Sequence, residues 1–406
     1  FSTRFILKQN LFFNSVPPRP WMSGRESREG NQVRPLVTSM DSDDGPLDCY
    51  CSDITLSASL FFRITSSVTF SVFIYEGMAY NLMFLARVLP AVGKAEYIPF
   101  FFLLFNSIWF LALLSYFRAS MEDPGRLPLA WHSFVQEVGN ALSTASASAR
   151  WAPGKATFCR KCNVPRPERS HHCNVTGCCI LRMDHFCPWI NNCVGLGNYK
   201  FFLQLLIYGT LSSLIGIFST VPEFVMVIEK LLGVENPLWQ ANLQMTDMMA
   251  FIVFEGMAIF LLVLLIPVLY THVPLACSNR TAIENNYANM DNPYDLGFRQ
   301  ANLEQILGGL GYDWFIPMKP LNPQTDGISF LRKDDPASSI DKSVDSDTLQ
   351  AESLWRMRYQ VRPSNRSEPD LGPLRSISRW LTGEADDEPG SPISPVSHQV
   401  TAGCGP

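Results

Sequence analysis

A short stretch, LRMDHFCPWINNC at residues 181–193, combines an aspartate, a histidine and two cysteines around an apolar Pro-Trp step. A histidine two residues before a cysteine can accept the thiol proton, and an aspartate beside that histidine can set its tautomer and stabilise the imidazolium. Asp184, His185 and Cys187 therefore form a candidate activated nucleophile, with Cys187 as the attacking sulfur. Pro188 follows directly, which favours a fixed, exposed turn over a ligand buried in a metal cage.

The cysteines are unevenly spread along the chain. Seven of the eleven fall within 35 residues, among histidines and basic residues. Disulfide frameworks are typical of small secreted chains, so this cluster indicates metal and thiol chemistry in a reducing compartment. The seven are Cys159, Cys162, Cys173, Cys178, Cys179, Cys187 and Cys193.

The spacing Cys159-x2-Cys162 places two thiolates on one tight turn, about 4 Å apart, which suits one edge of a tetrahedral zinc site. His172 and Cys179 can complete a Cys3His set. Short loops with little regular structure then fold around the ion, and the metal supplies much of the folding free energy. We interpret these four residues as ligands of a structural zinc ion.

Four apolar stretches approach or exceed the ~20 residues that a helix needs to cross a bilayer. They cover residues 64–86, 97–117, 201–221 and 248–271. Four such runs are hard to bury in one water-soluble core, and the charged fraction of 17% is low for a soluble domain. The sequence predicts an α-helical polytopic membrane protein with four transmembrane helices and a cytosolic zinc-binding, cysteine-rich domain between the second and third.

Loop charges predict the orientation of these spans. Residues 118–200 carry ten Lys and Arg residues, whereas the 222–247 loop has only Lys230. We therefore expect the cysteine-rich segment and both termini to be cytosolic. The formal net charge of -5 gives no reason to expect a nucleic-acid partner.

Two carboxylates, Glu76 and Glu255, lie inside predicted spans, where an ionisable group is costly. They are either a polar lining within the bundle or hydrogen-bonded structural groups. A channel or transporter built on them leaves the Asp-His-x-Cys arrangement unexplained, so we set that function class aside.

The same features divide the chain into six regions. The chain begins with Phe1 and not with methionine, and the first region is expected to be a cytosolic N-terminal region that is partly disordered or artefactual. The last is rich in Ser, Pro, Asp and Glu and is expected to be a disordered tail. The regions are 1–59, a transmembrane hairpin at 60–117, the cysteine-rich domain at 118–200 (core 159–198), a second hairpin at 201–271, a cytosolic region at 272–333 and the tail at 334–406.

A thiolate at a membrane surface, beside four spans, points to a thioester substrate with a long acyl chain. Burying such a chain contributes ~0.8 kcal/mol per CH2 group, so a helical bundle can bind it. From the residues alone, acyl transfer through a thioester on Cys187 is one possible chemistry.

Residues 159–202, CRKCNVPRPERSHHCNVTGCCILRMDHFCPWINNCVGLGNYKFF, resemble the cysteine-rich domain of the DHHC-type protein S-acyltransferases, or palmitoyltransferases. The family's flanking marks are similar too. DPG at 123–125 follows the second span, and TAIE at 281–284 resembles the family's TTxE. NPYDLGFRQANLEQILG resembles its C-terminal motif, with Asn302 at the key asparagine if one residue is inserted. The resemblance covers roughly residues 60–330.

This resemblance implies a two-step ping-pong reaction. Cys187 would attack the thioester of palmitoyl-CoA, with His185 as base and Asp184 as its orienter. The acyl group would then pass to a juxtamembrane cysteine of a cytosolic or membrane substrate protein. The resemblance also implies an integral, multi-pass protein of the endomembranes, in the Golgi or endoplasmic reticulum rather than the plasma membrane.

Family members bind two zinc ions, neither of them catalytic, and the second site departs from the family pattern here. The family ligates this ion through a histidine at position 186 and cysteines at 173, 176 and 193. This chain keeps Cys173 and Cys193 but has Phe186 and Thr176, and neither replacement is a useful ligand. One zinc ion is therefore expected, and a second is uncertain.

Three outcomes are open at the second site. Cys178 can swing in with His171 to rebuild it. Alternatively the site is lost, and packing around Phe186 and Trp189 holds the loop of a weaker enzyme. In the third outcome the loop is too loose to position Cys187, which leaves a catalytically silent membrane scaffold or partner-binding protein.

The TTxE match is incomplete as well, because Ala282 replaces a threonine that helps to hold the aspartate in the family. Its loss is expected to cost one hydrogen bond, roughly 1 kcal/mol. We expect an acyltransferase with impaired activity, and the scaffold is the alternative.

Overall fold

The membrane-spanning part of the chain consists of four long apolar helices. The computed structural model describes residues 56–146, 149–234, 243–334 and 348–361. Within them, four helical segments are long and apolar enough to cross a bilayer, which confirms the predicted four spans. They are Ala58–Ala91, Ala95–Met121, Tyr199–Leu231 and Met245–Cys277. Each is longer than the apolar stretch predicted for it, because the backbone helix continues through polar residues that a hydropathy pattern does not include.

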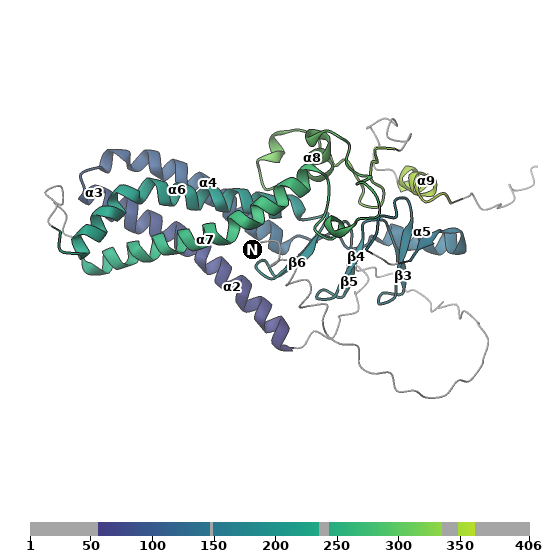
Figure 1. Ribbon diagram of the computed structural model, residues 1–406, viewed down its shortest axis with the longest axis horizontal. Helices are drawn as coiled ribbons and strands as arrows, with labels where there is room; N and C mark the ends of the chain where they lie inside the picture. Colours follow the sequence, from purple (N-terminus) through teal and green to yellow (C-terminus); the bar gives the residue numbers. More distant parts are fainter. Residues whose placement is uncertain (1–55, 147–148, 235–242, 335–347, 362–406) are drawn as a thin grey trace, which may run out of the picture. The chain divides into compact units, whose positions relative to one another are not determined.

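The third span is the centre of the bundle, since α6 packs against both α4 and α7 (Figure 1). In its most apolar window 67% of the residues are buried, against 28% or less in the other spans. The elements of the spans are α2 (Leu56–Ala79), the π-helix η1 (Tyr80–Val88), α3 (Leu89–Ala91), η2 (Ala95–Tyr97), α4 (Ile98–Met121), α6 (Tyr199–Leu231) and α7 (Met245–Cys277).

The two intramembrane glutamates both contact α6. Ser213 donates a hydrogen bond to Glu76 Oε1 at 2.9 Å, and Thr220 donates one to Glu255 Oε1. Both carboxyl groups are buried. These contacts support the structural interpretation, in which the glutamates join neighbouring helices.

The cysteine-rich module between α4 and α6 is built from very short strands. Strands of two to four residues are too short to be stable alone, so the module depends on its core and on metal binding. A three-stranded sheet has β1 parallel to β2 and β3 antiparallel to β2, and two separate hairpins pair β4 with β5 and β6 with β7. The elements are α5 (Leu129–Val138), η3 (Gly139–Ala141), β1 (Thr144–Ala145), β2 (Ala156–Cys159), β3 (Val164–Arg166), β4 (His171–Cys173), β5 (Cys178–Ile180), β6 (His185–Cys187) and β7 (Asn192–Val194).

Two asparagines fix this module to the end of the second span. Asn192 Nδ2 donates to three main-chain carbonyls at the carboxyl end of α4, at 2.9–3.2 Å. Asn198, which is fully buried, donates to the carbonyls of Ala119 and Cys193 at 3.0 and 2.8 Å. The hairpin that carries the candidate nucleophile is thus held against the bundle by direct hydrogen bonds.

The part of the chain after the last span folds back onto the module through short helices. These are η4 (Glu284–Asn286), α8 (Arg299–Leu307), η5 (Tyr312–Trp314) and α9 (Thr348–Arg358). Asn302 of α8 is buried and donates to the Cys277 carbonyl at 2.9 Å, which ties α8 to the end of α7. The resemblance marked this asparagine, and the structure gives it a structural contact.

Helix α9 lies in the region predicted to be a disordered tail, so the structure differs from that prediction over residues 348–361. Trp355 and Tyr359 are buried against Trp131 and Phe134 of α5. The average composition of residues 334–406 concealed these few apolar side chains, which have a partner surface on α5. The expectations for residues 1–55, 335–347 and 362–406 lie outside the described residues.

Candidate active site and metal centre

Four predicted zinc ligands converge at the edge of the β2–β3 and β4–β5 strands. Cys159 ends β2, and Cys162 follows in a turn whose main-chain N–H points at the Cys159 sulfur. His172 and Cys179 are cross-strand partners in the β4–β5 hairpin, so their side chains share one face. All four ligand atoms lie within 4.8 Å of one another.

The distances in this group fit a tetrahedral zinc ion. Zn–S bonds of ~2.3 Å and Zn–N bonds of ~2.0 Å place the ligand atoms about 3.5 to 3.8 Å apart. Here Cys162 Sγ is 3.7 Å from Cys179 Sγ, and His172 Nδ1 is 3.2 and 3.7 Å from the Cys162 and Cys159 sulfurs. The residues therefore fit zinc, as the sequence indicated.

Removing this metal is expected to unfold the cysteine-rich module but not the helical bundle. Zinc-dependent modules draw much of their folding free energy, about 10 kcal/mol or more, from the ion. The spans are held by their own apolar packing. After treatment with a strong chelator, limited proteolysis should cleave within residues 126–198, while the far-ultraviolet circular dichroism of the helices persists. Protection of that segment after verified metal loss would contradict a structural role.

The candidate nucleophile, base and orienter are brought together on and beside β6. His185 Nδ1 lies 2.7 Å from Asp184 Oδ2, and Cys187 is close enough to His185 to influence its pKa. Cys187 ends β6 and is 5% exposed, in an apolar cluster with side chains such as Tyr116 and Phe202 from the spans. The sequence predicted an exposed turn at Cys187, and this prediction is wrong because the side chain is buried. The Cys187 side chain is instead packed among apolar side chains of the helical bundle.

Electrostatics favour the protonated form of His185. Burial by itself lowers the pKa of His185, but the hydrogen bond with Asp184 and the influence of nearby Cys187 raise it to about 10. Burial raises the pKa of Asp184, the opposite direction to its effect on His185, but the neighbouring His185 and the main chain hold the pKa of Asp184 at about 2. Asp184 is therefore a carboxylate across the neutral range, and His185 is stable as an imidazolium beside it.

The second oxygen of Asp184 is held by the TAIE segment. The main-chain N–H of Ala282 donates to Asp184 Oδ1 at 2.9 Å. A threonine hydroxyl is absent at position 282, as noted from the sequence, but a backbone amide needs no particular side chain. The aspartate thus keeps a donor on each oxygen, His185 on one and Ala282 on the other.

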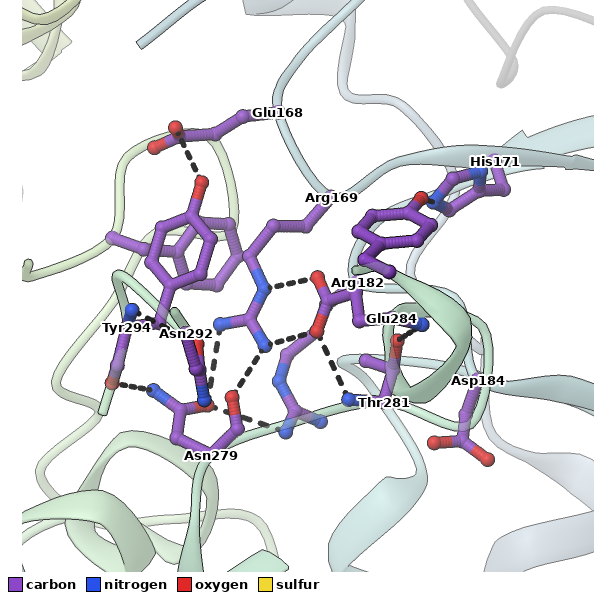
Figure 2. A network of polar contacts seen from close by, with 12 residues as sticks. Glu168, Arg169, His171, Arg182, Asp184, Asn279, Thr281, Glu284, Asn292 and Tyr294 are labelled. Carbon is purple, nitrogen blue, oxygen red and sulfur yellow. Dashed lines mark hydrogen bonds and ion pairs between the residues drawn. The ribbon is translucent and has the colours of Figure 1, made fainter. Parts of the chain in front are cut away.

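A buried polar network supports this segment (Figure 2). Arg169 makes a two-pronged ion pair with Glu284, at 2.8 and 2.9 Å, and also donates to Asn279. Glu284 Oε2 in turn accepts the Thr281 N–H at 2.9 Å. The Arg169 guanidinium lies over the ring of Tyr294 in the C-terminal motif, with its Cζ 4.4 Å from the ring centre. The loop that contacts Asp184 is therefore fixed by charge-assisted hydrogen bonds, which are among the strongest in proteins.

His272 near the end of α7 is a site residue that the sequence reasoning missed. Its Nδ1 lies 3.7 Å from Asp184 Oδ2, and its ring is 5.4 Å from that of His185 and 5.0 Å from that of Phe202. The side chain is 3% exposed. A histidine directly after the last predicted span, nine residues before TAIE, was the available signal.

Replacing His272 with phenylalanine is expected to slow acyl-enzyme formation roughly 10- to 100-fold, because a shift of about 1 Å in the reacting groups has effects of this size. His272 restricts the space around Asp184 and His185 without reaching the reacting sulfur, so we treat it as a positioning residue. Single-turnover acylation measures the effect, and His272→Asn, which keeps a polar group there, should retain more activity. Equal losses in both variants would point to packing alone.

In the part of the chain that the structure describes, the candidates for the second metal site do not bring three ligand atoms together. Cys173 and Cys193 lie in one apolar cluster, and the Cys193 thiol donates to the His185 carbonyl at 3.5 Å. Cys178 is the cross-strand partner of Cys173, but its thiol donates to Thr176 Oγ1 at 3.4 Å. Among the described residues, only two groups bring three or more possible ligand atoms within 4.8 Å of one another, and neither contains these cysteines.

Comparisons with known proteins agree with this geometry. The family model described as DHHC palmitoyltransferase matches residues 152–289. Probable protein S-acyltransferase 13 of Arabidopsis thaliana is 34% identical over 58% of this chain and 77% of its own length. Palmitoyltransferase ZDHHC3-A of Danio rerio is 33% identical over 56% of this chain and 68% of its own length. Palmitoyltransferase ZDHHC15 of Homo sapiens is 34% identical over 51% of this chain and 57% of its own length.

The chain belongs to the DHHC palmitoyltransferase family. It is a multi-pass membrane protein with protein S-acyltransferase function, as the sequence predicted. Nothing in these comparisons favours the catalytically silent scaffold.

Proposed function

We propose that the chain transfers a fatty acyl group from acyl-CoA to protein cysteines through a thioester on Cys187. The observation that carries this proposal is the arrangement of three groups beside an apolar cluster of the bundle: Asp184 is hydrogen-bonded to His185, and Cys187 lies on the same strand as His185. A nucleophile, a base and an orienter in this order can perform acyl transfer. The apolar surroundings of the sulfur suit a substrate with a long hydrocarbon chain.

Before the first step His185 holds the proton of the Cys187 thiol, and in that step the Cys187 thiolate attacks the thioester carbon of the acyl-CoA. The new sulfur–carbon bond forms as the bond to the CoA sulfur breaks, and the imidazolium returns its proton to the departing CoA thiolate. In the second step His185 takes the proton of a substrate thiol, that sulfur attacks the acyl carbon, and Cys187 is released. Asp184 stays ionised and stabilises the imidazolium in both steps.

Zinc has a supporting role in this proposal. Cys159, Cys162, His172 and Cys179 would hold the ion as a structural group that folds the module, and no reaction step passes through it. The ligand hairpin β4–β5 is directly followed by the segment that leads into β6, so its fold sets where the nucleophile lies.

The test is self-acylation of the purified full-length chain in detergent with an alkyne analogue of palmitoyl-CoA. We expect one label per chain, removed by neutral hydroxylamine as a thioester should be, and mapped by mass spectrometry to the peptide that contains Cys187. A folded protein that takes no label, or takes it only on other cysteines, would overturn the proposal.

We also propose that the cysteine-rich module and both termini face the cytosol and that the protein resides in the Golgi or endoplasmic reticulum. The ten basic residues of 118–200 support the orientation. Its partners are then the bilayer, acyl-CoA and proteins with cysteines near the cytosolic membrane face. Protease protection in sealed microsomes, together with imaging against organelle markers, tests both parts, and protection of the module from external protease would reverse the orientation.

A further inference from the structure

The half of the cysteine-rich module next to the nucleophile is where this chain departs most from its family. The family pattern places four metal ligands at positions 173, 176, 186 and 193, and this chain has Cys, Thr, Phe and Cys there. Phenylalanine has no donor atom for a metal, and a neutral hydroxyl is a poor zinc ligand. Two thiols remain, which is too few for a structural zinc site.

Neighbouring side chains do not restore the missing ligands. His171 lies with its Nε2 3.4 Å from the Tyr287 hydroxyl, and the Cys178 thiol is directed to Thr176. The main-chain N–H of Thr176 points to the Cys173 sulfur at 3.4 Å, as in a metal-binding turn. The side chain of Thr176 itself, however, is a hydroxyl and not a thiol. The rebuilding of a second site by Cys178 and His171 is therefore not supported.

An apolar cluster occupies this part of the module instead. Phe186 is the cross-strand partner of Cys193 in the β6–β7 hairpin and packs with side chains from β4, β5 and the TAIE segment. The cluster consists of Cys173, Val175, Cys178, Ile180, Met183, Phe186, Cys193 and Ile283. The thiols in it act as small apolar groups, which is the usual behaviour of buried free cysteines.

Phe186 also reaches beyond the module, to the first membrane span. Its ring centre lies 4.9 Å from that of Phe62 on α2, at an interplanar angle of 59°, and Phe62 is 3% exposed. Tilted aromatic pairs at this distance are attractive beyond their burial. Because Phe186 sits between His185 and Cys187 on β6, this contact holds the strand that carries both groups.

We propose that this chain is a single-zinc member of its family, in which the apolar cluster and the Phe62–Phe186 contact take the place of the second zinc ion. The metal would hold the β6–β7 hairpin by tying it to the β4–β5 hairpin. Here the cluster makes the same connection, and Phe62 adds a link to the bundle. The proposal concerns the metal content and the packing of the module, so it does not depend on whether Cys187 carries an acyl group.

The first test is the zinc content of the purified, folded full-length chain, measured by elemental analysis. We expect one zinc per chain, unchanged in Cys173→Ser and Cys193→Ser. Two zinc ions per chain, or the loss of one in either variant, would overturn the proposal. Restoring the family residues in the double variant Thr176→Cys with Phe186→His should raise the content to two, and a content that stays at one would show that the lost ligands are not what removed the site.

The second test concerns the aromatic contact. Phe62→Leu keeps an apolar side chain but removes the ring, and Phe61→Leu is the matched control because Phe61 is 59% exposed on the same helix. Phe62→Leu should increase proteolytic cleavage around β6 several-fold with zinc content unchanged, and Phe61→Leu should leave it as in the parent chain. Equal cleavage in the two variants would overturn the role of Phe62.

Discussion

Cys187→Ser should abolish acyl-enzyme formation. The rate should fall at least about a thousand-fold, as it does when an enzyme loses its catalytic nucleophile. The thiol is the more acidic and more nucleophilic group, and a serine hydroxyl would need far stronger activation than His185 provides. Transfer to substrate proteins should stop as well, because the acyl group has no intermediate carrier. Hydroxylamine-sensitive labelling and substrate acylation in cells measure the two steps.

The serine variant should keep the fold, because it differs by a single atom in an apolar cluster that remains filled. The matched control is Cys277→Ser, a partly buried free cysteine at the end of α7 that makes no contact with the proposed reacting atoms. This control should label like the parent chain. Full labelling of Cys187→Ser, or loss of label in the control, would contradict the assignment of the nucleophile.

The local chemistry of the site was readable from the sequence because it is encoded in short spacings. The first zinc set and the Asp184, His185 and Cys187 group each lie within about 20 residues, so hairpins alone bring them together. The four spans were readable too, since a bilayer sets the length of an apolar helix. The structure brings the residues of each group together, and the catalytic roles of Asp184, His185 and Cys187 stay a prediction.

The contacts that span long stretches of chain were not readable. His272 approaches Asp184 only because α7 packs on α6, and no local pattern states that packing. The Ala282 contact was missed for a different reason, since it uses a main-chain N–H that every residue except proline has. Helix α9 was missed because its burial depends on Trp131, more than 200 positions earlier.

Glu284→Gln should destabilise the module by about 3–5 kcal/mol, the usual cost of leaving one member of a buried ion pair without its partner. Arg169 and Glu284 have side chains only 1% and 2% exposed, so water cannot replace the lost carboxylate. Glutamine keeps one acceptor oxygen but loses the charge and one prong of the pair. The consequence should extend to activity, because the same turn presents the Ala282 N–H to Asp184. Chemical unfolding followed by tryptophan fluorescence, and self-acylation of the fraction that remains folded, measure these two effects.

An exposed ion pair is the matched control for this prediction. Lys319 pairs with Glu122 at 3.2 Å, but its side chain is 71% exposed, so Lys319→Ala should cost less than about 1 kcal/mol. A difference of several kcal/mol between Glu284→Gln and Lys319→Ala is the expected result. If the two variants unfold at the same denaturant concentration, the Arg169–Glu284 pair is not the element that holds the TAIE turn. The position of Asp184 would then have to depend on its contacts with His185 and with the surrounding apolar side chains.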